Sequence, residues 1–494
     1  AFKGQRRELV AEDYVYSLKR FADPALNSAG WASVEQVKIV GLAAHRAKAI
    51  ASKRPFDYDT PIAGLRALDR YTLQITLEEP NPRLHYDQLT ESDLYGAVAR
   101  EVVEFYGDAI AEHPVGTGPF VLKQWRRSSF IALERNPSYR ERFYDAEPAP
   151  DDAEGQALLA RFKGRRLPMI DRVEISITEE AQPRWLSFVN GSADFIERVP
   201  AEFIEVAMPG GRLAPHLAKK GVHAYRSLAP DSTFIYFNMD DPVVGGYTPE
   251  RVALRRAMGL ALDLEREINT VRRGQAIPAQ SPIAPNLVGY DPQFKSVNSE
   301  YNPARAKALL DLYGWVDRDG DGWREQPDGS ALVLTMASQP DQTTRQLNEL
   351  WKKGWDAIGV RVQFAPAKWP ENLKAARAGK LMMWSVGSLA DVPDGQTLLA
   401  RLYGPQIGHQ NIARFRNAEV DRLFERMLVM PDGPERLAMF DRIKRIAVAY
   451  MPYKYLVHRI FTDLAQARLV GYRRPLFWQN WWEMVDIVDA ARPH

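Results

Sequence analysis

Residues 390–395 carry two carboxylates, Asp391 and Asp394, between an apolar stretch and a helical pattern. A carboxylate in such a loop can hold a cationic group of a ligand through charge-assisted hydrogen bonds. It can also cap the following helix by accepting its first N–H groups. From residue types alone, capping is the commoner role, and Asp394, which lies closer to the helix, is the better candidate for it.

Residues 317–322 read Asp-Arg-Asp-Gly-Asp-Gly and repeat the acidic start of a calcium-binding loop. Asp317, Asp319 and Asp321 occupy its first, third and fifth positions. The twelfth position holds Asp328, where such a loop needs a glutamate that binds through both oxygens. We therefore expect no metal site here and keep calcium as the minority alternative.

Sequence motifs of catalysis are missing from the chain. Gly116 and Gly118 begin like a dinucleotide-binding loop, but Val121 stands where the third glycine belongs. There is no Walker sequence, no His-Glu-x-x-His motif and no Gly-x-Ser-x-Gly motif. The eight histidines are scattered without metal-ligand spacing. We expect no enzymatic activity and no cofactor, although a catalytic pair of carboxylates stays open.

The composition is that of a globular protein with more than one domain. The 494 residues exceed what one hydrophobic core supports, and 45% of them are hydrophobic. Lysine plus arginine, 65, nearly balances aspartate plus glutamate, 63, so a nucleic-acid partner is not expected. The absence of cysteine excludes disulfides and suits an oxidising compartment. We find no membrane-spanning stretch and no signal peptide in this sequence.

Hydrophobic patterns place these loops in a mixed α/β framework. Alternation of apolar and polar residues predicts strands at residues 71–77, 173–177 and 360–364. Helical spacing and capping residues predict a helix over residues 252–268 behind Thr248 and Pro249, and others that begin at Asn302 and after Asn417.

Four separated segments follow one another in a specific order. They read Gly-Thr-Gly-Pro-Phe at 116–120, Arg-Asn-Pro-Ser-Tyr at 135–139, the helical pattern at 252–268, and Ala-Asp-Val-Pro-Asp-Gly at 390–395. In this order, and over almost the whole chain, they resemble the peptide and nickel family of solute-binding proteins that serve ABC importers. Membership in this family implies a small solute that is captured between two lobes and left chemically unchanged.

The resemblance implies ligand-binding roles for five residues. In peptide-binding members, the residue that matches Asp391 accepts the α-ammonium of the ligand, and an arginine near Arg345 binds a carboxylate. Trp384 and Tyr403 flank the loop and are expected to line the pocket, with Asp394 as the rival of Asp391. The ordinary alternatives are capping for the aspartates, a solvated helix position for Arg345 and core packing for Trp384.

The resemblance also implies a two-lobed, periplasmic-binding-protein-like α/β fold of the cluster C type with an extra small domain. We assign residues 1–115 to the small domain, residues 116–235 with 465–494 to lobe I, and residues 236–464 to lobe II with the main ligand loop. Family members begin with a segment that supplies strands to the first lobe, whereas this chain starts inside the small domain. We therefore expect the N-terminal part of the family fold to be absent from this chain, so that either a separate segment completes the first lobe or this lobe is compromised.

The implied function is that of the substrate-binding component of an ABC importer in the periplasm. A monomer would capture a peptide-like solute by hinge closure and deliver it to a membrane permease. Three alternatives stay open. The solute is a metal chelate, haem or an opine-like compound, the protein is a secreted hydrolase, or it is an interaction protein with a filled cleft.

Overall fold

The computed structural model of the chain describes residues 2, 5, 7–28, 30–85, 89, 95–477 and 481–488. Two compact units can be distinguished. Unit 1 comprises Ala1–Glu197, Leu213–Tyr225 and Asp463–His494, and unit 2 comprises Arg198–Arg212 and Arg226–Thr462. The chain therefore passes between the units more than once. The finer division of unit 1 into a small domain and a lobe stays a prediction.

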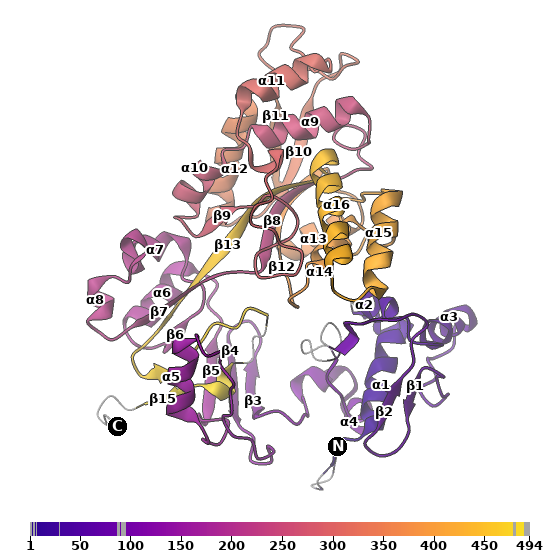
Figure 1. Cartoon of the computed structure of the whole chain (residues 1–494), viewed down its shortest axis with the longest axis vertical. Helices are drawn as coiled ribbons and strands as arrows, with labels where there is room; N and C mark the ends of the chain where they lie inside the picture. The colour runs from indigo at the N-terminus through magenta and orange to yellow at the C-terminus, as the bar shows by residue number, and fades with distance from the viewer. Residues whose placement is uncertain are drawn as a thin grey trace. The chain divides into compact units, whose positions relative to one another are not determined.

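Unit 1 is assembled from short helices and small antiparallel sheets. Its elements, all but β14 labelled in Figure 1, are α1 (Ala11–Ala22), α2 (Trp31–Gln36), α3 (Leu42–Ser52), β1 (Leu65–Ala67), β2 (Leu73–Ile75), α4 (Arg100–Tyr106), β3 (Phe120–Arg126), β4 (Phe130–Arg135), α5 (Ala153–Phe162), β5 (Arg172–Ser176), α6 (Ala181–Val189), β6 (Phe195–Ile196), α8 (Pro215–Ala218), β14 (Leu469–Val470) and β15 (Asp486–Ile487). Strands β3, β4 and β5 form one antiparallel sheet, and β1 with β2 and β14 with β15 form pairs.

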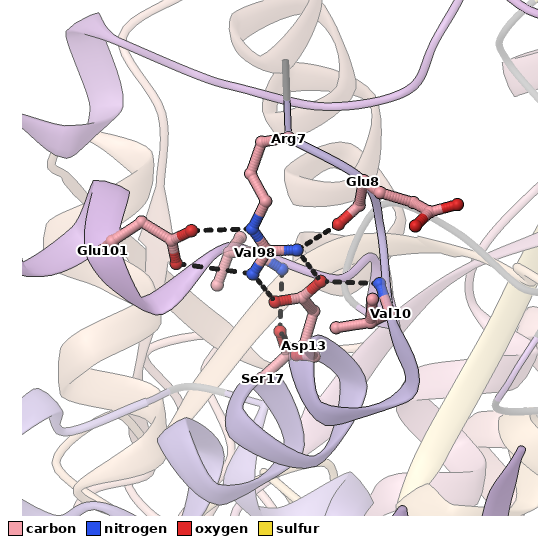
Figure 2. Close-up of polar contacts among 7 residues, drawn as sticks. All are labelled: Arg7, Glu8, Val10, Asp13, Ser17, Val98 and Glu101. Carbon is pink, nitrogen blue, oxygen red and sulfur yellow. Dashed lines mark hydrogen bonds and ion pairs between the residues drawn. The ribbon is translucent and has the colours of Figure 1, made fainter. Parts of the chain in front are cut away.

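An ion-pair network ties the start of the described chain to α1 and α4. Figure 2 shows the guanidinium of Arg7 between two carboxylates, with its Nη2 at 2.6 Å from Asp13 and its Nε at 2.7 Å from Glu101. The carboxylate of Asp13 also accepts the N–H of Val10 at 2.9 Å, just before the helix begins. The hydroxyl of Ser17 accepts the N–H of Val98 at 2.8 Å, so α1 is also bonded to the segment that precedes α4.

Unit 2 is built around a mixed sheet covered by helices. Its elements are α7 (Ala201–Ala207), β8 (Asp231–Phe237), α9 (Pro249–Leu260), α10 (Leu264–Arg266), β9 (Ala276–Pro278), α11 (Pro303–Leu312), β10 (Val333–Ser338), α12 (Gln342–Asp356), β11 (Arg361–Pro366), α13 (Trp369–Arg377), β12 (Met383–Leu389), α14 (Gln396–Leu399), α15 (Ala418–Val429) and α16 (Pro434–Tyr450). Two further strands, β7 (His223–Leu228) and β13 (Tyr453–Ala465), contain a boundary between the units.

The strands of unit 2 lie in the order β11-β10-β12-β8-β13. The first three are parallel to one another, and β8 runs antiparallel to both β12 and β13. One face of this sheet packs Ile235 and Met336 against helix residues such as Trp351, all of them buried. The other face carries Trp384, whose ring centroid lies 6.5 Å from that of Trp369 in α13. Helices therefore cover both faces, which suits parallel strands.

Side-chain caps set the helix starts that the sequence predicts. Asn302 accepts the N–H of Arg305 at 3.0 Å, and Asn417 accepts the N–H of Val420 at 3.1 Å. These two predicted helices are confirmed as α11 and α15. No described helix combines the length and the hydropathy that a membrane span requires.

The continuous helix expected over residues 252–268 is wrong in its second half. Helix α9 ends at Leu260, and a new short helix starts at Leu264. The cause is Asp263, whose carboxylate accepts the N–H of Arg266 at 2.9 Å and so caps a second helix instead of continuing the first. An aspartate favours this local bond over a place inside a helix.

Candidate ligand-binding site

The parallel strands of unit 2 contain a topological switch point, where the connections from two neighbouring strands lead in opposite directions along the sheet. From β10 the chain passes through α12 to β11 on one side, and then through α13 to β12 on the other side of β10. The connections that follow β10 and β12 therefore diverge at the carboxyl ends of these two neighbouring strands. In open α/β sheets, ligands bind at such a point. This end of the sheet is therefore the candidate place for a ligand.

Strand β12 continues beyond its neighbour at this point. In the register of β10 with β12, Met336 pairs with Met383 and Ala337 with Trp384, and β10 ends at Ser338. Strand β12 runs on to Leu389 and remains paired with β8 along its other side. The second half of β12 is therefore an edge strand on the side that faced β10.

Main-chain polar groups of β12 alternate between this edge and β8. Hydrogen bonds from the N–H of Asn238 to the carbonyl of Met382 and from the N–H of Ala390 to the carbonyl of Pro230 bracket the pairing. In an antiparallel pair, every second residue turns its N–H and C=O to the partner strand, and the residues between turn them away. The outward groups beyond β10 belong to Gly387 and Leu389, and they form no hydrogen bond within the described chain.

Asp391 takes the next outward position after these two residues, in the loop that follows β12. Its side chain is exposed, and its carboxylate receives no hydrogen bond or ion pair from the described residues. Its neighbours Ala390 and Val392 are buried, so the loop itself is anchored. Desolvation raises the pKa of Asp391 above its ordinary value, although the charge of Arg401 acts in the opposite direction. This carboxylate is thus partly desolvated and open to a cationic group.

Asp394 has a different setting, although it lies in the same loop. It is fully buried, and its carboxylate is 2.8 Å from the guanidinium of Arg436 in α16. It also accepts the N–H of Gln396, the first residue of α14, at 2.9 Å, which is the local bond of an aspartate turn; the residue at the N-cap of α14 is Gly395. The backbone on both sides of Asp394 is held by Val288, whose N–H bonds to the carbonyl of Pro393 at 3.1 Å. Asp394 therefore holds the loop that presents Asp391.

Arg401 follows α14 and lies on one face of the β12 edge. Its guanidinium donates a hydrogen bond to the hydroxyl of Ser388 and lies 5.6 Å from the ring centroid of Phe234. Burial lowers the pKa of Arg401, although Asp391 raises it. Sequence analysis missed this residue, and the available signal was a single charge within the apolar run Leu399-Ala400-Arg401-Leu402.

The remaining predicted residues lie in different places around this end of the sheet. Arg345 is exposed in the first turns of α12, just after β10, where its guanidinium bonds to the carbonyl of Pro340. Tyr403 stacks on Phe424 of α15 at 4.6 Å between ring centroids. Trp384 is fully buried on the sheet. A ligand role for these residues stays a prediction, and Arg345 shares the carboxyl end of the parallel strands with Asp391.

Two other features of unit 2 lie apart from the predicted residues. The carboxylates of Asp317, Asp319, Asp321 and Glu325 lie within 4.8 Å of one another. They are engaged by the N–H groups of their own loop, for example that of Gly320 at 2.7 Å, so the turn has a structural explanation that requires no ion. A pocket of about 260 Å³ lies between α9 and α11 and contains none of the five predicted ligand residues.

Comparison with protein families shows to which family the chain belongs. The sequence profile of the bacterial extracellular solute-binding proteins, family 5 Middle, matches residues 6–410. The chain belongs to this family of solute-binding proteins. The resemblance inferred from the four separated segments is thereby confirmed.

Two similar solute-binding proteins are named after different ligands. Haem-binding protein A of Haemophilus influenzae is 25% identical over 366 residues, which are 74% of this chain and 58% of that protein. Di/tripeptide-binding protein 2 of Pseudomonas aeruginosa is 22% identical over 481 residues, which are 94% of this chain and 77% of that protein. The chain thus spans less than two thirds of the first relative and about three quarters of the second.

A solved structure of the same architecture confirms the fold class. The periplasmic binding protein DppA from Helicobacter pylori, in complex with the peptide STSA, superposes with a TM-score of 0.75 at 19% identity. The match covers 98% of this chain and 82% of that protein. The solute-binding protein therefore has the expected α/β fold of the two-lobed periplasmic binding proteins.

Replacing Arg436 by methionine is predicted to destabilise unit 2 strongly. The change leaves the carboxylate of Asp394 buried without its partner, which costs about 3–5 kcal/mol of unfolding free energy. Urea unfolding followed by tryptophan fluorescence measures this loss, because Trp315, Trp351 and Trp355 are buried in unit 2.

The matched control is Arg442→Met in the same helix. Arg442 pairs with Glu419 at 2.6 Å, but both side chains are largely exposed. An exposed pair contributes less than about 1 kcal/mol. Equal effects of the two substitutions would contradict the role given to the buried pair.

Proposed function

We propose that this solute-binding protein captures short peptides and delivers them to the membrane permease of an ABC importer in the periplasm, without enzymatic activity of its own. The observation that carries the proposal is the open main-chain edge of β12 with Asp391 at its end. The names of the relatives support it, since one is a di/tripeptide-binding protein and another holds a peptide.

The edge suits a peptide because both partners carry the same polar groups. An extended peptide presents an N–H and a C=O on the same side of its backbone at every second residue. Gly387 and Leu389 present matching groups at the same spacing, so a peptide can pair with β12 as an added strand. Main-chain pairing of this kind is independent of side chains and suits ligands of many sequences.

Asp391 supplies the anchor for one end of the peptide. Its carboxylate is exposed, free of partners in the described chain, and partly desolvated. An α-ammonium at this point forms charge-assisted hydrogen bonds, which are about twice as strong as neutral ones. The position of Asp391, two residues beyond Leu389, sets the amino terminus of the ligand next to the paired edge.

We give second place to a non-peptide solute such as haem, a metal chelate or an opine-like compound. Its support is the name of one relative, haem-binding protein A. Haem binding in proteins commonly uses an axial histidine. His458 lies in β13, but it is buried and its Nδ1 is bonded to the carbonyl of Asp231 at 2.7 Å. This histidine is therefore not presented to a ligand. The peptide is the better candidate because the open edge of β12 matches a peptide backbone.

Replacing Asp391 by asparagine is predicted to weaken the binding of Ala-Ala-Ala by about tenfold or more, because a charge-assisted bond becomes a neutral one. Isothermal calorimetry measures the change. Asp441→Asn is the matched control, since Asp441 is paired with Arg445 in α16 and lies outside the site. The N-acetylated peptide, which lacks the ammonium, should bind wild type and Asp391→Asn equally. An unchanged affinity of Asp391→Asn for the free peptide would remove Asp391 from the site.

Peptide affinity is also predicted to depend on pH through Asp391. Only the ionised carboxylate holds an ammonium, and the pKa of Asp391 is raised above its ordinary value of 3.8. The affinity therefore falls as the pH is lowered, and the fall begins at a higher pH than for an ordinary aspartate. Titration with Ala-Ala-Ala-amide between about pH 4 and pH 7 avoids the charges of the ligand that change in this range. A slope that persists in Asp391→Asn would assign the effect to another group.

A further inference from the structure

Arg401 carries a positive charge that no described carboxylate neutralises. Arg401 donates to Ser388 and lies over Phe234, but no described carboxylate lies within ion-pairing distance of its guanidinium. Asp391 is close enough to affect the pKa of Arg401, yet the two groups form no ion pair. A partly desolvated charge without a partner is unfavourable, so the binding of an anion at this point is favourable.

A second observation on the same face of the sheet points to an anion. Ser232 is directly opposite Ser388 in the pairing of β8 with β12, so the two side chains project from the same face about 5 Å apart. Ser232 is 2% exposed, and its hydroxyl has no hydrogen-bond partner among the described residues. A buried hydroxyl without a partner is rare and calls for an acceptor. The hydroxyls of both serines and the guanidinium of Arg401 thus form one group of donors.

A second arginine near the same edge, Arg459, differs from Arg401 because its charge is neutralised by an ion pair. Arg459 of β13 forms an ion pair with the fully buried carboxylate of Asp231 and also donates its backbone N–H to Asp231 at 2.8 Å. A side chain added at Gly387 would come within 3.4 Å of its guanidinium, so Arg459 lies beside the β12 edge. Its charge is already compensated by Asp231. The unpaired charge of Arg401 is therefore specific to that residue and is not a general property of this edge.

We propose that Arg401, with the hydroxyls of Ser388 and Ser232, binds an anionic group of the ligand beside the ammonium site at Asp391. The preferred ligands are then peptides that carry a carboxylate within a few bonds of their amino terminus. This inference rests on the proposed peptide-binding function and narrows its ligand class. Two sources offer this chemistry, namely the side chain of an acidic first residue and the terminal carboxylate of a dipeptide.

The opposite charges of Asp391 and Arg401 suit such a ligand for an electrostatic reason. A long neutral peptide brings only its ammonium to this point, so Asp391 is neutralised and Arg401 is left alone. A ligand with both charges close together compensates both residues at once. The preference therefore depends on where the ligand carries its carboxylate, and a remote carboxylate contributes little.

Calorimetry with tripeptide amides tests the proposal, because the amide removes the terminal carboxylate. Glu-Ala-Ala-amide is predicted to bind wild-type protein about tenfold more tightly than Gln-Ala-Ala-amide, which has the same shape without the charge. Ala-Ala is likewise predicted to bind more tightly than Ala-Ala-amide if the dipeptide carboxylate reaches Arg401. A preference in only one of the two pairs identifies the source of the carboxylate. It supports the proposal when that same pair loses its preference in Arg401→Gln, because Arg345 is a second arginine at this end of the sheet.

Substitution of Arg401 assigns the preference to this residue. In Arg401→Gln the difference between Glu-Ala-Ala-amide and Gln-Ala-Ala-amide is predicted to vanish, and in Arg401→Lys part of it returns with the charge. Arg442→Gln, an exposed arginine paired with Glu419, is the control and should retain the full difference. A preference that persists in Arg401→Gln would overturn the assignment.

The outcomes separate this inference from the function on which it rests. If wild-type protein binds the tripeptide amides but does not distinguish glutamate from glutamine, and Ala-Ala does not differ from its amide, the anion site is wrong and peptide binding stands. If none of these peptides binds, the proposed function itself fails. The wild-type measurements decide both points even if an Arg401 variant does not fold.

Discussion

The proposed site depends on the hydrogen-bonding requirement of the β12 backbone. Main-chain N–H and C=O groups need hydrogen-bond partners, and a strand that continues past its neighbour leaves every second pair without one. In unit 2 this happens at the carboxyl ends of the parallel strands, because β10 ends at Ser338 while β12 continues to Leu389. An edge strand elsewhere would be a liability. Here it lies where an α/β sheet binds its ligands.

The charged side chains near this edge fall into two groups. Some form ion pairs that stabilise the fold, and others have no ion-pair partner within the described chain and can bind a ligand. The pair of Asp394 and Arg436 is buried and closed, and Arg459 is compensated by Asp231. Asp391 and Arg401 influence each other without meeting, and both are partly desolvated. A rigid loop with one closed ion pair can present a second, unpaired carboxylate without losing its shape. Binding energy is then not spent on ordering the loop.

Local sequence patterns predicted much of the framework and the main candidate residue, but not the partners that complete the site. Asn302 and Asn417 predict the starts of their helices because capping is a local interaction. The order of the four short segments led to the family, and through it to Asp391. The partner of Asp394 is 42 residues away in α16, which no local pattern reveals. The open edge at Gly387 depends on the relative lengths of two strands, and the unpaired state of Arg401 depends on the whole fold around it.

Hydrogen exchange at single amides of β12 tests the central claim most directly. On saturation with Ala-Ala-Ala, the outward N–H groups of Gly387 and Leu389 should exchange more slowly, because a bound peptide backbone accepts them. The N–H groups of Val386 and Ser388 face β8 already and serve as internal controls in the same strand. Slower exchange at the outward pair alone is the result that the account predicts. Tight binding of the peptide with unchanged exchange at Gly387 and Leu389 would contradict it.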